Sequence, residues 1–153
     1  GLTFSTCASA NFRMLVAQNA GTLVLGGPIV REQNFKVNVD FTIAGGTVKA
    51  TDDVSFTNLR TNLVEAGASV VFDVAEGKVL DVSTMTFGAG ASVTKTGAGT
   101  IRFGTSLPDA LSVEGGSVEY AQPVDLGDSL TLGTDATLVF ASDGISATSI
   151  VGI

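Results

Sequence analysis

The sequence contains no histidine, no tryptophan and a single cysteine among its 153 residues. Without histidine, neither a Ser-His-Asp triad nor a Cys-His pair can be assembled, which closes the common routes to an activated nucleophile. The one cysteine, Cys7, excludes an internal disulfide, and its small, uncharged surroundings hold no cation to activate the thiol. We expect an incidental thiol, with an intermolecular disulfide as the alternative. The sequence therefore predicts no catalytic residue, no cofactor and no metal, and we expect a protein that is not an enzyme.

Charge is also scarce, and it is unevenly placed. Charged residues make up 15% of the chain, whereas about a quarter is typical of soluble domains. Residues 1–102 hold all eight basic residues and eight acidic ones, so the net charge of −7 falls entirely on residues 103–153. Nucleic acid and anionic membrane surfaces both require a basic face, which this distribution disfavours. No apolar run approaches the roughly 20 residues of a membrane span.

Glycine and small apolar residues are abundant instead. The chain is 44% hydrophobic, and it contains 19 glycines but only 3 prolines. Short runs rich in Val and Thr between glycines favour many short strands. Residues 35–43 alternate between apolar and polar side chains, which is the pattern of a half-buried strand. Only residues 58–65, with Leu59 and Leu63, are considered for a short helix.

A short phrase recurs along the chain: glycine or aspartate, a small residue, then alternating apolar positions. It begins at Gly21, Gly46, Gly67, Gly90, Gly99, Gly116 and Asp135. When the copies at 90 and 99 are taken as a close pair, the spacings are 25, 21, 23, 17 and 19 residues. Such a period favours a parallel β-solenoid of six or seven coils, a rod about 30 Å long. The alternative is an antiparallel β-sandwich, which the Gly-Gly and Gly-Ala-Gly turns disfavour because hairpins prefer Asn-Gly or Asp-Gly.

We therefore predict an all-β fold, a parallel β-helix or solenoid of about 20-residue coils, in one domain over residues 1–153. The end segments, residues 1–12 and 141–153, are apolar and carry no charge and one charge, respectively. A solenoid has an open strand edge at each end that normally needs a polar cap. Apolar ends therefore predict either a continuing parent chain or a docked subunit. The assembly residues that we expect are Leu2, Phe4, Ile145, Ile150, Val151 and Ile153.

Three groups of residues are candidates for a catalytic, phosphate-binding or metal-binding site. Asp52 and Asp53, with Lys49 nearby, are interpreted as turn residues rather than a lyase-type site. Lys95 precedes two glycines, but no helix follows, so a phosphate loop is not expected. Four acidic residues of the last third could align on successive coils and bind Ca²⁺, although an outward acidic face that keeps the protein soluble is favoured. These four are Asp125, Asp128, Asp135 and Asp143.

Residues 95–104, Lys-Thr-Gly-Ala-Gly-Thr-Ile-Arg-Phe-Gly, are followed by a Gly-Gly-Ser-Val strand at 115–118. Together they resemble the autotransporter-associated repeat of bacterial surface proteins, Leu-Thr-Lys-x-Gly-x-Gly-Thr-Leu-x-Leu-x-Gly and a second strand. The match gives one good copy near residues 88–120. The resemblance implies a right-handed parallel β-helix in a secreted or surface-displayed adhesin, fibre or scaffold, without catalytic residues.

The function that we expect is a non-catalytic extracellular or cell-surface structural module, a surface or fibre component that assembles end to end. The alternative is an adhesin-type binding module for a glycan or a host protein, which would expose aromatic side chains such as Tyr120, Phe12 and Phe56. A β-helical polysaccharide-degrading enzyme is the third and least favoured hypothesis.

Overall fold

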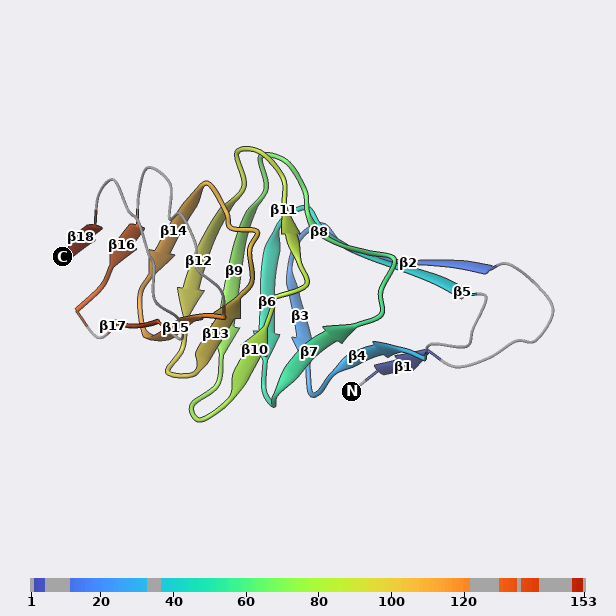
Figure 1. Cartoon of the computed structure of the whole chain (residues 1–153), viewed down its shortest axis with the longest axis horizontal. Helices are drawn as coiled ribbons and strands as arrows, with labels where there is room; N and C mark the ends of the chain where they lie inside the picture. Colours follow the sequence, from blue (N-terminus) through green and yellow to red (C-terminus); the bar gives the residue numbers. More distant parts are fainter. Residues whose placement is uncertain are drawn as a thin grey trace.

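The computed structural model describes residues 2–4, 12–32, 37–121, 130–134, 136–140 and 150–152 (Figure 1). These residues form eighteen short strands and no helix. The strands are β1 (Leu2–Phe4), β2 (Phe12–Gln18), β3 (Thr22–Leu25), β4 (Ile29–Arg31), β5 (Val37–Ile43), β6 (Gly46–Ala50), β7 (Val54–Thr57), β8 (Thr61–Val64), β9 (Ser69–Val74), β10 (Val79–Asp81), β11 (Thr86–Phe87), β12 (Ser92–Thr96), β13 (Thr100–Phe103), β14 (Ala110–Val113), β15 (Gly116–Tyr120), β16 (Leu130–Leu132), β17 (Ala136–Phe140) and β18 (Ile150–Gly152).

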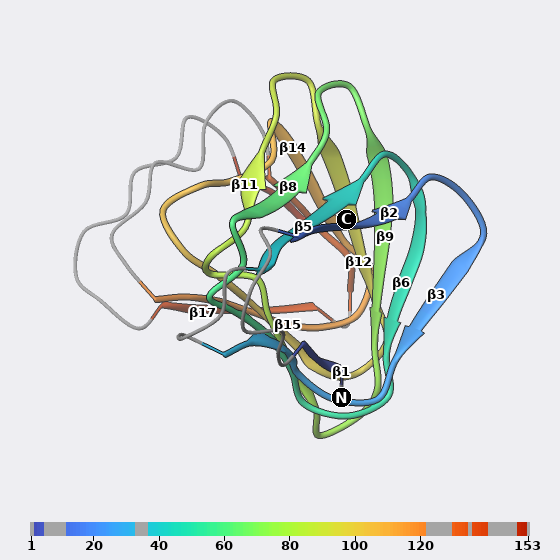
Figure 2. The same cartoon turned by 90° about the vertical axis from the view of Figure 1, so that its right-hand side faces the viewer.

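The strands make three parallel sheets that enclose one interior (Figure 2). Sheet 1 has the order β1-β4-β7-β10-β13-β15-β17, sheet 2 the order β11-β8-β5-β2, and sheet 3 the order β18-β16-β14-β12-β9-β6-β3. Consecutive strands of the chain fall on different sheets, so the chain winds into a β-solenoid of about five turns. The predicted solenoid is confirmed. The sandwich alternative is wrong because every described strand pair is parallel. The helix considered at residues 58–65 is also wrong, since this segment contains β8.

Each copy of the recurring phrase leads into a strand, and successive copies on the same sheet are one turn apart. Its copies at 21, 46, 67 and 90 lead into β3, β6, β9 and β12, which are neighbours in sheet 3. Its copies at 99, 116 and 135 lead into β13, β15 and β17, which are neighbours in sheet 1. The close pair at 90 and 99 is the point where the phrase passes from one sheet to another. Because the copies at 90 and 99 fall within one turn, counting every copy as a turn predicts more turns than the chain makes.

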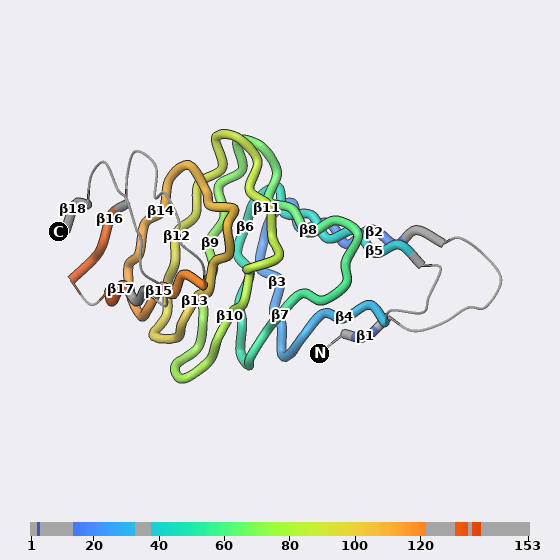
Figure 3. Tube along the Cα trace, in the orientation of Figure 1, coloured from blue at the N-terminus to red at the C-terminus, as the bar shows by residue number. Residues whose placement is uncertain are grey.

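Turn length changes along the solenoid. In sheet 1, an early turn runs from Ile29 to its partner Phe56, whereas a later and much shorter turn runs from Ile101 to its partner Val118. Because strands of one sheet stay in register, the extra residues of the early turns are placed in the corners. The tube in Figure 3 shows the β7–β8 corner swinging away from the β10–β11 corner of the next turn.

The interior is filled by the inward-facing residues of all three sheets. In β9 the buried positions alternate, with Val70, Phe72 and Val74 inside. Aromatic rings extend the ladders: Phe103 and Tyr120 stack with their centroids 5.8 Å apart. Tyr120 and Phe56 are both buried, so the expectation that they are exposed binding aromatics is wrong. Side-chain contacts of Phe12 lie outside the described residues.

Candidate functional site

Four of the six predicted assembly residues fall on edge strands at opposite ends of the solenoid (Figure 1). Leu2 and Phe4 belong to β1, the edge strand of sheet 1. Ile150 and Val151 belong to β18, the edge strand of sheet 3. The two other predicted positions, 145 and 153, lie outside the described residues. The backbone therefore places four of the six residues where a further strand would add.

Apolar side chains are exposed at the N-terminal end of the solenoid. Among the residues that the structure describes, the exposed large hydrophobics are Met14 at 42%, Leu15 at 57% and Val24 at 57%. They lie on β2 and β3, the edge strands of sheets 2 and 3. Met14 pairs with Val39 of the next turn, and Val39 is fully buried. The same position of the strand is therefore buried in the second turn, at Val39, and exposed in the first turn, at Met14.

Lys95 is the most unusual side chain of the interior. It lies on β12 two residues after the buried Val93, and it is itself fully buried. Its Nζ donates hydrogen bonds to the carbonyl oxygens of Thr96 at 2.6 Å, Gly97 at 2.7 Å and Gly115 at 3.1 Å. Burial lowers the pKa of Lys95 to about 8, an effect that the charge of a neighbouring aspartate partly offsets. The ammonium therefore ties its own corner to the corner of the next turn.

At Gly116 the corners around Lys95 stack too closely for any side chain. Gly116 has a φ of 73°, which favours glycine. A Cβ at this position would lie 2.3 Å from the carbonyl oxygen of Gly99 and 2.6 Å from that of Gly97. These glycines belong to the segment that resembles the autotransporter-associated repeat. Their role here is to let two turns approach at van der Waals distance.

The adjacent acids at positions 52 and 53 bind the next turn. Asp52 pairs with Lys78, with 2.7 Å between Oδ1 and Nζ, and Asp53 accepts a hydrogen bond from the backbone N–H of Val79 at 2.9 Å. The hydrogen bond from Lys78 is the main cause that lowers the pKa of Asp52. Lys49 pairs instead with Asp73. These acids thus hold consecutive turns together.

The four acidic residues weighed for Ca²⁺ lie outside the described residues. In the described part of the chain, no group of three or more Cys, Asp or Glu side chains is placed to hold a metal ion.

Arg102 forms a charge ladder on the outer face of sheet 1. It contacts Asp81 of β10 at 3.4 Å and Glu119 of β15 at 2.9 Å. We expect the Arg102→Met substitution to lower the free energy of unfolding by about 0.5–1 kcal/mol, because exposed ion pairs contribute little. Urea denaturation at low salt and at high salt would measure it. The loss should shrink in high salt, and a loss that salt leaves unchanged would contradict an electrostatic origin.

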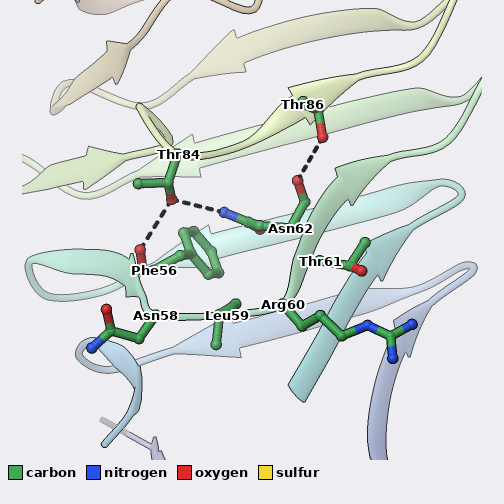
Figure 4. Close-up of a pocket in the computed structure, with 8 residues that line it drawn as sticks. All are labelled: Phe56, Asn58, Leu59, Arg60, Thr61, Asn62, Thr84 and Thr86. Carbon is green, nitrogen blue, oxygen red and sulfur yellow. Dashed lines mark hydrogen bonds between the residues drawn. The ribbon is translucent and has the colours of Figure 1, made fainter. Parts of the chain in front are cut away.

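A pocket of about 350 Å³ lies where the corners of two turns separate (Figure 4). Its wall on one side is the β7–β8 corner, and on the other side the β10–β11 corner and the start of β11. The lining residues are Phe56, Asn58, Leu59, Arg60, Thr61, Asn62, Thr84 and Thr86. Sequence reasoning did not find this pocket, because the residues come from turns 22 to 28 positions apart and share no motif.

The β7–β8 corner is fastened to the turn before it. Asn58 has a φ of 58°, and its side-chain Nδ2 donates to the carbonyl oxygen of Arg31 at 3.2 Å. In return, Nε of Arg31 donates to the carbonyl oxygen of Asn58 at 2.6 Å. Two reciprocal hydrogen bonds hold this corner toward the N-terminal turn and away from the next one, which keeps the pocket open.

No protein-family model, curated protein or solved structure matches the chain. The fold defines it as a parallel β-solenoid protein. Within the described residues, no helix has the length and hydropathy that crossing a membrane requires.

Proposed function

We propose that the chain is a non-catalytic structural module of an extracellular or cell-surface protein, and that it extends by joining copies of itself end to end. The proposed location rests on the resemblance of residues 88–120 to the autotransporter-associated repeat. In a longer parent chain, the same strand edges would receive the next turn of that chain.

The exposed apolar end carries this proposal. Edge strands present unpaired backbone N–H and C=O groups to any strand of matching direction. Here β2 and β3 combine such edges with the exposed side chains of Met14, Leu15 and Val24. All described strands are parallel, so β17 and β18 of a second copy have the direction needed to continue sheets 1 and 3 at β1 and β3. The β2 strand of sheet 2 adds exposed apolar surface beside these edges. A heterologous contact of this kind does not close on itself and produces filaments.

Light scattering of the 153-residue chain over a concentration series, with negative-stain microscopy of the same samples, tests the proposal. We expect the mean mass to rise with concentration and rods to appear. A monomer at every concentration would contradict end-to-end assembly.

A paired substitution, Leu15→Asp with Val24→Lys, should block this growth. The register supports the choice, since Leu15 pairs with Asp40 and Val24 with Lys49. Each substitution thus introduces the residue type that the paired position of the next turn already has. The two new charges cancel, so the net charge does not change. Charged residues on an edge strand oppose further pairing. The control is Thr94→Lys on β12, away from both edges, which should assemble as the wild type does. Equal assembly of the paired variant and the wild type would place the contact elsewhere.

A further inference from the structure

The pocket in Figure 4 exists because two consecutive corners differ in length. Val54 pairs with Leu80, and Leu63 pairs with Thr86. The chain takes nine residues from Val54 to Leu63, but only six between their partners. Three extra residues therefore project from one turn without a counterpart in the next. The pocket is a step in the solenoid, lined by the β7–β8 and β10–β11 corners and by residues of β7, β8 and β11.

Two threonine hydroxyls of the pocket are arranged as hydrogen-bond acceptors. The Thr84 hydroxyl lies 3.0 Å from the carbonyl oxygen of Phe56, and since a carbonyl only accepts, the hydroxyl proton is donated there. The Thr86 hydroxyl donates in the same way to the carbonyl oxygen of Asn62 at 3.0 Å. Each threonine oxygen thus has its single proton engaged. A ligand can only donate to these oxygens.

The same hydrogen-bond network fixes the orientation of the Asn62 side-chain amide. Because the proton of Thr84 is committed, Asn62 must face Thr84 with its NH₂ group, and Nδ2 donates to Oγ1 at 3.1 Å. This orientation fixes the position of the amide oxygen. Asn62 is 7% exposed, and its Oδ1 is buried without a hydrogen-bond partner in the described structure. A buried acceptor without a donor is unfavourable, so this part of the lining is left unsatisfied.

Charge is nearly absent from the pocket. The one charged lining residue, Arg60, contacts Asp40 at 3.3 Å, and its side chain extends away from Phe56 and Asn62 (Figure 4). Anions such as phosphate or a carboxylate bring no donors for the oxygens of Thr84 and Thr86. Phe56 and Leu59 add apolar surface to the lining.

We propose that this pocket binds a neutral, polyhydroxylated ligand, the chemical class of a single glycosyl unit. Such a ring supplies O–H donors to the exposed oxygens of Thr84 and Thr86, and its C–H face suits the apolar part of the lining. The pocket volume is within the range of small-molecule sites, about 300–1,000 Å³. This binding site is separate from the solenoid ends and does not depend on end-to-end assembly.

Amide chemical-shift titration of the ¹⁵N-labelled chain tests the proposal. The neutral probes are the methyl glycosides of glucose, galactose and mannose; methyl glucuronide is the anionic probe and methylammonium chloride the cationic one. We expect at least one neutral glycoside to shift amides of residues 56–62 and 84–86 in a saturable way, while the charged probes do not.

Substitutions at Thr86, an exposed residue of β11, identify the contact. Thr86→Val removes the acceptor oxygen with little change of shape and should weaken binding about tenfold, or about 1.4 kcal/mol. Thr86→Arg should abolish binding by filling the pocket. Thr94→Val on β12 is the matched control and should bind as the wild type does. The proposal is overturned if no neutral glycoside gives saturable shifts, if only a charged probe does, or if both Thr86 variants bind like the wild type.

Discussion

Replacing Lys95 with methionine is expected to lower the free energy of unfolding by about 3 kcal/mol at pH 7. Methionine has a similar volume and suits the apolar neighbours, so the loss reports the ammonium and not a cavity. Three carbonyl oxygens, of Thr96, Gly97 and Gly115, lose their donor at once. Release from the cost of burying a charge offsets part of this loss. Urea denaturation of both proteins measures the difference.

The control is Lys78→Met, which removes a partly exposed lysine that pairs with Asp52. Solvent-exposed pairs of this kind contribute little to stability, so we expect a much smaller loss than for Lys95→Met. If Lys95→Met were as stable as the wild type while Lys78→Met behaved as expected, the buried ammonium would not be holding the two corners together.

The same pair of proteins, wild type and Lys95→Met, should differ in the pH dependence of stability. The pKa of Lys95 is about 8 in the folded chain against 10.5 for an ordinary lysine. Between these values the unfolded chain binds more protons, so wild-type stability rises with pH, by up to about 1.4 kcal/mol per pH unit. Below pH 8 this contribution is flat. The methionine variant lacks it, so the gap between the two proteins should widen from pH 8 to pH 9.5. A constant gap would contradict the lowered pKa.

The second large effect is expected for Gly116→Ala, which should cost at least about 4 kcal/mol or prevent folding. Two penalties combine. The φ of 73° disfavours any residue with a Cβ by about 1–2 kcal/mol. The new Cβ would also overlap carbonyl oxygens of the neighbouring turn, 2.3 Å and 2.6 Å away. Backbone atoms of a packed turn cannot move aside cheaply, so the turns must separate.

Gly67→Ala separates the two penalties. Gly67 has a φ of 71°, but no atom lies within 4 Å of the position that a Cβ would take there. Only the backbone penalty applies, and we expect a cost of about 1–2 kcal/mol. Thermal and urea unfolding of both variants provide the comparison. Equal losses in the two variants would mean that close stacking at Gly116 contributes nothing.

The strands could be predicted because alternating side chains leave a local signal. Their parallel arrangement could be predicted because the glycine-bounded phrase recurs at a spacing that suits one turn of a solenoid. Alternation at residues 35–43 marks a strand, and glycine-bounded phrases mark where strands begin. Two apolar residues, Leu59 and Leu63, are too few to distinguish a helix from a strand. The strand β8 begins at Thr61, so it contains Leu63 but not Leu59. The assignment of each phrase to a sheet depends on corner lengths, which no phrase contains.

The inward direction of Lys95 shows why sites were harder to predict than strands. Its spacing from Val93 places it on the buried face, but its charge favours the outside. The conflict is resolved by the carbonyl oxygen of Gly115 in the next turn, which only the fold brings near. The pocket was missed for the same reason. Asn62 and Thr84 meet because their turns stack, and nothing in either segment alone indicates a partner.

Unequal turn lengths at the two ends determine the outline of any filament built from this chain. The first turns are long, as the pairing of Leu2 with Ile29 shows, whereas the last turns are short, as the pairing of Leu111 with Leu130 shows. Head-to-tail stacking would set a long turn against a short one at every junction. Sheets 1 and 3 reach both ends, whereas in the described chain sheet 2 stops at β11. The filament would have two continuous sheets and a projecting long turn at each junction. These projections would recur about every 25 Å and point in the same direction. The two ends of the filament would therefore differ chemically.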